Sequence, residues 1–460
     1  MAPNFRREER EQTLLFPPSL DDYVAEEHPA RFVRELVEDL DHRGQLSSLY
    51  ESYREDGRGG KAYHPRVMLT VLLYAYTQGV TSSRRIEREC QENLAYRYLA
   101  ANQSPDHRAI ANFRKRHLAA FQGLFRDVLK LCEAAGLVEL GRVAIDGRRV
   151  RGSASRDKTI TAEALDAKIA ELSQQILADA ERRDAEEDAE LGDEAGYELP
   201  KEFRTKQERL ERIKKAREVI EERERKIRDQ YQEKLDNRKR FEKETGTKKS
   251  GRPPEPPSTT QSRNTKHPPR ANTTDPDSRL LKVRQGYIQG YNAQAAVDCG
   301  SQVIVSQHVT QDVVDTRQLE PALDGIEENL GRLPKQAVLD AGYWSPDNAE
   351  LEELRDVELF IATQKDSNQR KAAKVGIAPR GRIPRDTSPR ERMERKLLTR
   401  AGKEAYRSRG STVEATFGQQ VTRGLTSFIL RGLEAVNAEW SLWCTSHNLL
   451  KLWRAGLAIA

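Results

Sequence analysis

The sequence predicts a mixed α/β core with flanking helices, preceded by an all-α region and interrupted by a charged helical insertion. Two short apolar runs, 142–146 and 335–340, each end on an aspartate and are typical of strands. Residues 291–309 alternate apolar and polar side chains around a Cys-Gly-Ser turn, as a β-hairpin does. Residues 160–245 instead carry apolar side chains at helical spacing.

Composition narrows the class of protein. The chain has 460 residues, 37% hydrophobic and 33% charged, which is typical of several modules joined by solvated helices or polar linkers. The 78 Lys and Arg against 73 Asp and Glu leave a net charge of +5, so local patches matter more than the total. The four cysteines form no C-x-x-C pair, which favours buried thiols over a zinc site.

No apolar run approaches the roughly 20 residues that cross a bilayer. The first residues, MAPNFRREEREQ, show no export signal. We therefore expect a cytoplasmic protein without a membrane partner.

Residues 1–137 are predicted to form a helical domain. Apolar residues recur at helical spacing in 31–40, and His64-Pro65 opens a second helix that ends near Gly79. Ser104-Pro105-Asp106 is predicted to begin a further helix, with Ser104 as the N-cap, that continues through Leu131.

The core is predicted to begin at 141–157 and to be interrupted by residues 158–245. In that insertion Ile213, Ile220 and Ile227 lie seven apart, and 165–176 follows four-three-four spacing, which indicates a helical hairpin or short antiparallel coiled coil. Residues 246–280 are rich in Pro, Ser and Thr and are predicted to be a disordered linker. Residues 281–460 complete the core with a helix at 316–329, a strand at 357–363 and C-terminal helices from 393 onward.

Three carboxylates are candidates for metal chemistry. Asp146 and Asp340 end short apolar strands, and Glu414 lies on a predicted helix after a basic segment. Two hard divalent ions held by carboxylates can activate an attacking oxygen and stabilise the leaving oxygen in phosphodiester displacement. An Asp before a small residue is also a common turn residue, and a Glu on a charged helix is often only solvated, so spacing alone leaves both interpretations open.

Several segments, in order, resemble those of IS1182-type transposases of the IS5/IS4-like DDE group, over nearly the whole chain. They are 104–117 (SPDHRAIANFRKRH), 144–147 (AIDG) with 153–155 (SAS), 286–298 (GYIQGYNAQAAVD), 338–343 (VLDAGY), and 412–418 (TVEATFG) with 431–433 (RGL) and 447–450 (HNLL).

The resemblance implies an RNase H-like fold with two Mg²⁺ (or Mn²⁺) ions held by Asp146, Asp340 and Glu414. It implies hydrolysis at the terminal inverted repeats of an insertion sequence, followed by strand transfer into target DNA. Water would be the first nucleophile and a freed 3′-hydroxyl the second. Double-stranded DNA would be the partner, a homodimer or larger synaptic complex the active assembly, and the nucleoid the location.

Two features depart from the family pattern. Tyr406 and Arg409 keep the usual spacing, but Glu414 comes one residue late. Val421 stands where the family places a basic residue, and the nearest cation is Arg423. These departures support an alternative, a transposase-derived DNA-binding protein with impaired catalysis.

Basic residues are predicted to contact DNA phosphates, which supply affinity rather than sequence recognition. A helix-turn-helix-like arrangement of the N-terminal set would place one helix in the major groove, and a solvated helical face is the alternative. The insertion could dimerise the enzyme, grip DNA or do neither, and a coiled-coil scaffold is a third class for the whole chain. The predicted DNA-binding residues are Arg84, Arg85, Arg108, Arg114, Lys115, Arg116, Arg407, Arg409 and Arg423.

Overall fold

The chain divides into two compact units. The computed structural model describes residues 19–53, 62–190, 201–248, 253–254, 269–377, 381, 384 and 387–456. Unit 1 comprises Met1–Glu139 with Ser441–Ala460, and unit 2 comprises Leu140–Trp440. One helix, α15 (Leu433–Arg454), contributes residues to both units.

The described part of unit 1 is helical, as the sequence predicts for the N-terminal region. Helix α2 is buried along almost its whole length, and its Tyr76 ring lies edge-on against Trp443 of α15 at 5.4 Å between centroids. The elements are η1 (Leu20–Tyr23), α1 (Pro29–His42), η2 (Ser47–Leu49), α2 (Pro65–Thr77), α3 (Ser83–Glu92), α4 (Leu94–Leu99), α5 (His107–Arg116) and α6 (Leu118–Ala134).

The helix predicted to start at Ser104 begins later and is split. Asp106 is the N-cap of α5, because its Oδ1 accepts hydrogen bonds from the backbone N–H groups of Arg108 (2.8 Å) and Ala109 (3.0 Å). His117, at φ −111° and ψ 33°, separates α5 from α6. The predictions of Ser104 as the cap and of one continuous helix were wrong.

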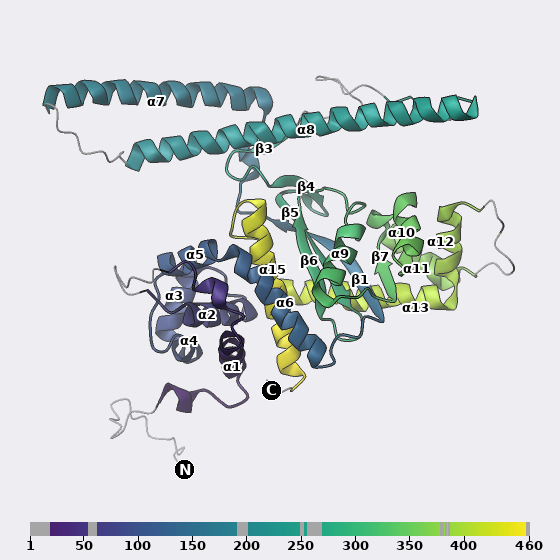
Figure 1. The fold of residues 1–460 in the computed structure, drawn as a ribbon, viewed down its shortest axis with the longest axis horizontal. Coiled ribbons are helices and arrows are strands. Elements are labelled where there is room, and N and C mark those ends of the chain that lie inside the picture. The colour runs from purple at the N-terminus through teal and green to yellow at the C-terminus, as the bar shows by residue number, and fades with distance from the viewer. Residues whose placement is uncertain are drawn as a thin grey trace, which may run out of the picture. The chain divides into compact units, whose positions relative to one another are not determined.

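Unit 2 contains a mixed six-stranded sheet in the order β4-β5-β1-β7-β8, with β6 also paired to β5 (Figure 1). Strand β1 is antiparallel to β5 and parallel to β7, and β7 is parallel to β8. The strands are β1 (Arg142–Arg151), β4 (Arg279–Val283), β5 (Gly286–Asp298), β6 (Ile304–Thr310), β7 (Gln336–Leu339) and β8 (Glu358–Ile361).

Strand β1 does not end at Asp146 as predicted. Its parallel pairing with β7 stops at Ile145, opposite Leu339, but its antiparallel pairing with β5 continues to Arg151. Gly147 is thus a strand residue and not a turn residue. A Cβ there would lie 2.2 Å from the Gln294 Nε2 atom, so close side-chain approach explains the glycine.

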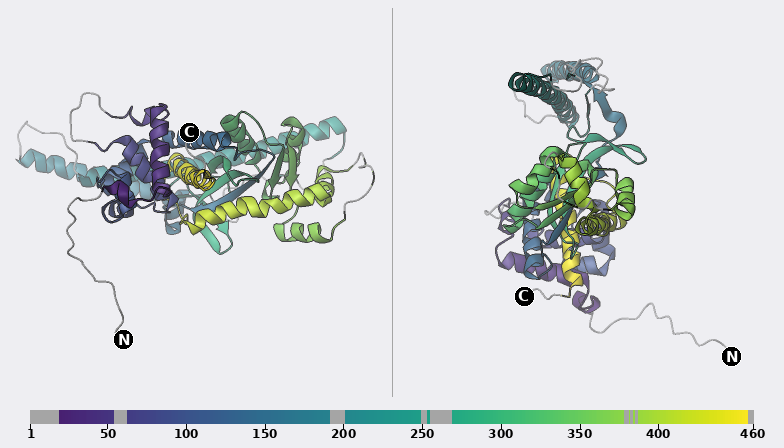
Figure 2. Two further views of the ribbon diagram at one scale, coloured as in Figure 1. Left: turned by 90° about the horizontal axis from the view of Figure 1, so that it is seen from below. Right: turned by 90° about the vertical axis from the view of Figure 1, so that its right-hand side faces the viewer.

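Helices surround the sheet in unit 2. Helix α9 contacts β5 and β6, α10 and α12 contact β8, and α13 contacts β1, β7 and β8. Helices α13 and α14 are joined by the π-helical turn η5 into one continuous rod, the yellow-green helix in Figure 2. The elements are α9 (Leu319–Leu330), η4 (Ala341–Tyr343), α10 (Pro346–Leu354), α11 (Asp366–Val375), α12 (Pro389–Leu398), α13 (Arg400–Arg409), η5 (Gly410–Glu414) and α14 (Ala415–Thr422).

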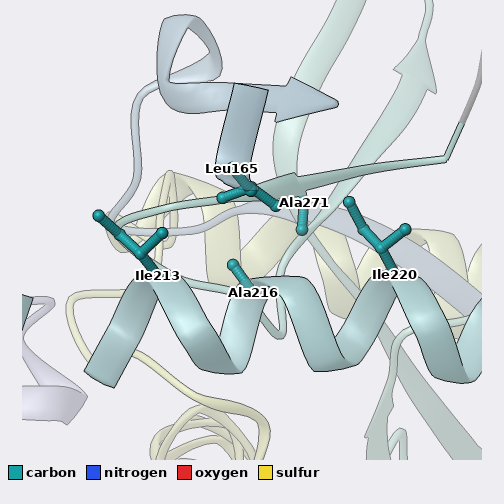
Figure 3. Packing of buried hydrophobic residues seen from close by; sticks show 5 residues of the cluster. All are labelled: Leu165, Ile213, Ala216, Ile220 and Ala271. Carbon is teal, nitrogen blue, oxygen red and sulfur yellow. The ribbon is translucent and has the colours of Figure 1, made fainter. Parts of the chain in front are cut away.

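The insertion consists of two long helices, α7 (Ala162–Glu190) and α8 (Lys201–Thr245), which contact each other. At their base lie η3 (Arg156–Lys158) and a small sheet of β2 (Thr159–Thr161) and β3 (Arg270–Asn272). A buried cluster joins α7, α8 and β3 there (Figure 3), whereas Ile227 further along α8 is 39% exposed. The cluster comprises Leu165, Ile213, Ala216, Ile220 and Ala271.

The predicted linker, 246–280, lies mostly outside the described residues. Its described C-terminal part contains β3 and the first residues of β4, so this part is ordered and paired. Within the described ranges, no helix has the length and apolar character needed to cross a membrane.

Candidate active site

Two of the predicted carboxylates follow neighbouring parallel strands. Asp146 comes directly after the last residue of β1 that pairs with β7, and Asp340 comes directly after β7 itself. Equivalent ends of adjacent parallel strands lie at the same edge of a sheet, so the two side chains leave the backbone close together. Glu414 comes from η5, which contacts β1 and β5.

All three carboxylates meet at one guanidinium group. The Arg409 Nη2 atom lies 2.8 Å from Asp146 Oδ2 and 3.9 Å from Asp340 Oδ2, and its Nη1 lies 3.0 Å from Glu414 Oε1. The Arg409 side chain is only 6% exposed. Arg409 is therefore enclosed by acidic groups, and the prediction that it contacts DNA does not fit its burial.

The electrostatics of the site follow from this crowding. Burial, together with the negative charges of Asp340 and Asp315, raises the pKa of Asp146 to about 7, although Arg409 opposes the shift. The neighbouring carboxylates Asp146 and Asp340 raise the pKa of Arg409, against the effect of its burial, and thus keep it charged. The site therefore concentrates negative charge that one buried cation partly neutralises.

Asp315 is a fourth carboxylate here, and the sequence analysis missed it. Its Oδ1 accepts hydrogen bonds from Asn292 Nδ2 (2.7 Å) and Gln294 Nε2 (2.8 Å) of β5. A Cβ on Gly147 would lie 2.7 Å from this Oδ1, and one on Gly342 would lie 3.2 Å from Asp315 Oδ2. Asp315 thus lies beside the residues that follow both Asp146 and Asp340.

A sequence signal for Asp315 exists. Strand β6 is antiparallel to β5, which is antiparallel to β1, so β6 runs parallel to β1. The segment after β6 consequently leaves the sheet at the edge where Asp146 lies. An aspartate soon after the end of a predicted hairpin strand is therefore a candidate for the same site.

The late position of Glu414 is explained by η5. In a π-helical turn the backbone hydrogen bond spans five residues, so one extra residue fits into a single turn. Glu414 is the fifth residue after Arg409, yet the two side chains form an ion pair at 3.0 Å. In an α-helix the residue four positions after Arg409 would lie beside it. The π turn instead places Glu414, five positions after Arg409, there.

The carboxylates suit a hard divalent cation by ligand type, because oxygen ligands are what Mg²⁺ and Mn²⁺ prefer. Burial raises the pKa of Asp146 most, and the negative charges of Asp340 and Asp315 add a repulsion that a bound cation relieves. In the described part of the chain, no three His, Cys, Asp or Glu side chains are grouped closely enough to hold one ion. The residue types and their convergence therefore fit a metal, while Arg409 supplies the positive charge in this arrangement.

The predicted basic residues of unit 1 divide into two kinds. Arg114 is 2% exposed and donates to the Thr81 carbonyl (2.6 Å) and the Ser83 hydroxyl, so it stabilises packing and is unavailable to DNA. Arg116 lies with its guanidinium carbon 5.5 Å from the Tyr53 ring centroid and is exposed. The other exposed members are Arg84, Arg85, Arg108 and Lys115.

In unit 2, Arg407 is exposed on α13. Arg423, at the end of α14, is half-buried, and its Nε donates to the Gln419 carbonyl at 3.4 Å. Val421, where the family pattern has a cation, is half-buried as well.

Two family models match parts of the chain. Residues 18–116 match a transposase domain (DUF772), and residues 367–453 match a transposase DDE domain. The second match contains Arg409 and Glu414, whereas Asp146 and Asp340 precede it. No curated protein and no solved structure matches the chain.

Proposed function

We propose that this chain, a DDE-type transposase of an insertion sequence, binds the terminal inverted repeats of its element and cuts and joins DNA strands there. The observation that carries the proposal is the meeting of Asp146, Asp340 and Glu414 at one buried guanidinium. These residues are separated by long stretches of sequence and come from β1, the end of β7 and η5. Convergence of acids in this way is costly unless a cation binds between them.

The fold supports the same proposal. We take the core to be RNase H-like, because antiparallel β6, β5 and β1 are followed across the sheet by parallel β7 and β8. The charged insertion between β1 and the remaining strands is then a helical hairpin added to that core.

Asp146 and Asp340 would hold divalent metal, Mg²⁺ or Mn²⁺, and Glu414 would complete the ligand set. A bound pair of such ions lowers the pKa of an attacking water and stabilises the departing 3′-oxygen. The protein's own contribution is to fix the carboxylates on a rigid strand edge and a packed helix. Arg409 holds the side chains of Asp146 and Glu414 toward each other. Water attacks in the cleavage step, and the freed 3′-hydroxyl attacks target DNA in the joining step.

DNA would be held by cations on both units, of which Arg423 is half-buried and the others are exposed. Arg84, Arg85, Arg108, Lys115 and Arg116 would contact phosphates near the terminal repeat, and Arg407 and Arg423 would lie along the strand to be cut. A dimer or larger complex would bring two transposon ends together. Such a protein acts at the nucleoid.

The test is strand cleavage of a duplex that carries the element's ends, in Mg²⁺ or Mn²⁺. Asp146→Asn and Asp340→Asn should each abolish cleavage while DNA affinity stays within about threefold, because the catalytic groups act on the reacting phosphate and not on the bulk of the duplex. Asp347→Asn, an exposed aspartate at the start of α10, is the matched control and should cleave normally. Cleavage that survives both active-site substitutions would refute the assignment.

The alternative function is DNA binding without catalysis. It is favoured by Val421, which supplies no charge where a phosphate-positioning cation is expected. Binding by the wild-type chain without any cleavage in either metal would establish it.

A further inference from the structure

A cleft of about 420 Å³ lies at the base of the insertion, outside the carboxylate site. It is formed by η3, by the first turns of α7, by α8 and by the residues that follow β3. Its polar lining consists mainly of Lys158, Lys168, Arg209, Arg212, Thr273 and Thr274. Asp157 is the single carboxylate in this lining, so the cleft has a clear excess of positive charge.

Several other cations of α8 form ion pairs: Lys206 with Asp179, Arg217 with Asp166 (2.8 Å) and Lys226 with Glu222 (2.7 Å). The four cations of the cleft are instead gathered around one concave site. Within the described residues, no carboxylate forms an ion pair with a cation of the cleft. Unpaired like charges gathered in a concave site repel one another, and an anion relieves that repulsion.

The cleft has a rigid floor. Ile213 lies in its wall and belongs to the buried cluster with Leu165 and Ala271, which fixes α7, α8 and β3 together (Figure 3). The buried Asn272 fixes the segment Thr273–Thr274 that follows β3. Its Oδ1 accepts a hydrogen bond from the Thr274 N–H at 2.9 Å, and its Nδ2 donates one to the Ser155 carbonyl at 2.7 Å. The hydroxyl-bearing side of the cleft is therefore preformed.

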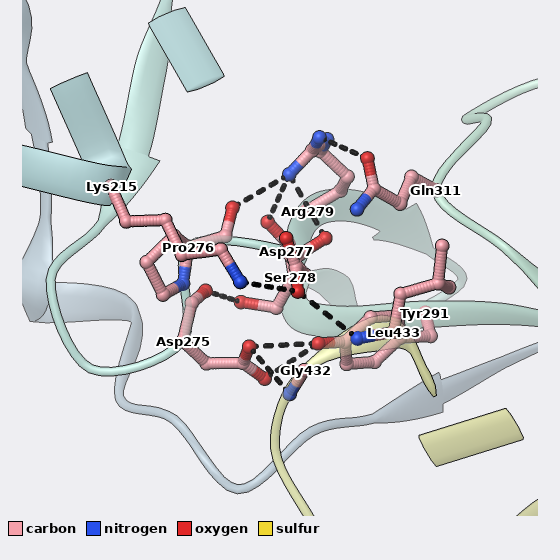
Figure 4. Close-up of polar contacts among 10 residues, drawn as sticks. All are labelled: Lys215, Asp275, Pro276, Asp277, Ser278, Arg279, Tyr291, Gln311, Gly432 and Leu433. Carbon is pink, nitrogen blue, oxygen red and sulfur yellow. Dashed lines mark hydrogen bonds and ion pairs between the residues drawn. The ribbon is translucent and has the colours of Figure 1, made fainter. Parts of the chain in front are cut away.

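The same segment continues into a loop that is tied to the catalytic sheet (Figure 4). Asp275, 1% exposed, accepts from the Tyr291 hydroxyl at 2.8 Å and from the Gly432 N–H at 3.1 Å. Asp277 accepts from the Leu433 N–H at 3.1 Å and pairs with Lys215 of α8 at 3.3 Å. Tyr291 is on β5, the strand that pairs with β1. The cleft is thereby anchored to the strand pair that carries Asp146.

We propose that this cleft binds the phosphodiester backbone of DNA and so gives the insertion a defined role as a second DNA-holding element. The inference rests on the proposed function, because that function makes DNA the anionic partner of the chain. Lysine and arginine with hydroxyl groups are the side chains that contact phosphate oxygens, and such contacts do not depend on base sequence. The cleft therefore holds duplex at a fixed place relative to the sheet without selecting its sequence.

The experiment compares two double variants of the full-length chain. Arg209→Gln with Arg212→Gln removes two charges from the cleft, and Arg228→Gln with Arg240→Gln removes two exposed charges from α8 outside it. Affinity for a duplex of about 40 base pairs is measured by fluorescence anisotropy between roughly 50 and 200 mM salt, because each phosphate contact contributes about 0.9 to the slope of log K against log salt. The cleft variant should lose roughly 1 to 2 from this slope, and the control variant should keep the wild-type slope.

The outcomes separate the two proposals. If the wild type binds and cleaves the element's ends but the cleft variant keeps the wild-type slope, the cleft inference is overturned and the proposed function stands. If the wild type binds no DNA at any salt concentration, the proposed function fails and the inference fails with it. Circular dichroism confirms that both variants fold.

Acetylation of lysines with and without DNA provides an independent measurement on the unmodified chain. Bound duplex should reduce labelling of Lys158 and Lys168 several-fold, and leave the exposed Lys239 of α8 unchanged. Equal labelling of all three lysines with and without DNA would overturn the inference.

Discussion

Replacing Arg409 by glutamine should destabilise unit 2 in the absence of metal, and the loss should depend on pH. The Arg409 and Asp146 side chains are 6% and 15% exposed, so the substitution leaves a buried carboxylate without its cation. Breaking such a pair costs about 3–5 kcal/mol when the remaining charge stays ionised. The Asp340 and Glu414 side chains are more exposed, at 34% and 42%. Each of their ion pairs with Arg409 therefore adds at most roughly a few tenths of a kcal/mol.

Protonation limits this cost. With a pKa of about 7 in the wild type, Asp146 is ionised at pH 8, and adding a proton there costs only about 1.4 kcal/mol. We therefore expect a loss of roughly 1.4–3 kcal/mol at pH 8. At pH 6 the loss of stability should be smaller, because Asp146 is already mostly protonated in the wild type, and a neutral carboxyl group gains little from the positive charge of Arg409.

The assay is urea unfolding in EDTA at pH 8 and pH 6, followed by circular dichroism. Adding Asp146→Asn to Arg409→Gln also removes the buried carboxylate that has lost its cation. The double variant should therefore be more stable at pH 8 than Arg409→Gln alone. The reasoning is refuted if Arg409→Gln unfolds within about 0.5 kcal/mol of the wild type at pH 8, or if its loss is the same at both pH values.

Two further predictions concern the π turn and a buried histidine. Deleting Ser411, an exposed residue of η5, should make the rod from α13 to α14 a regular α-helix and keep the rate of Mg²⁺-dependent cleavage within about tenfold of the wild-type rate. Inserting an alanine after Ser411 should instead rotate Glu414 by about 100° around the helix axis and abolish cleavage. Equal loss of cleavage in both variants would contradict the role of η5. Burial lowers the pKa of His117, so unfolded His117 takes up a proton before the folded form does, and unit 1 should lose stability as the pH falls below about 6.5. His117→Gln should flatten that decline in thermal unfolding measured from pH 7 to pH 5, and an unchanged decline would show that other groups cause it.

The strand residues were predictable because burial on both sides of a sheet leaves an apolar run in the sequence. The segments around Asp146 and Asp340 show that run, and they lie at adjacent strands as expected. The extension of β1 beyond Asp146 was not predictable from its own residues, Gly147 to Arg151, of which only Val150 is a large apolar residue. It depends on pairing with β5, a partner remote in sequence.

The roles of individual arginines could not be predicted, because a guanidinium has the same charge whether it faces solvent or lies inside the fold. Arg114 and Arg409 belong to basic segments, yet both are buried against polar partners. Asp315 was missed for a different reason, since its only sequence signal is its place a few residues after a predicted hairpin strand. Its position depends on the direction of β6 relative to β1.

The placement of the insertion has a consequence for how the chain folds. Val150 pairs with Tyr291, about 140 positions later, and such distant partners meet slowly because a long intervening chain must be ordered first. Helices α7 and α8 can form from local contacts alone, and the pairing of Thr159 with Asn272 then brings the two ends of the insertion side by side. Once β2 and β3 are paired, the intervening segments are short: residues 152–158 connect β1 to β2, and residues 273–285 connect β3 to β5. We expect the hairpin to assemble before the sheet and to set the rate at which β1 and β5 find each other.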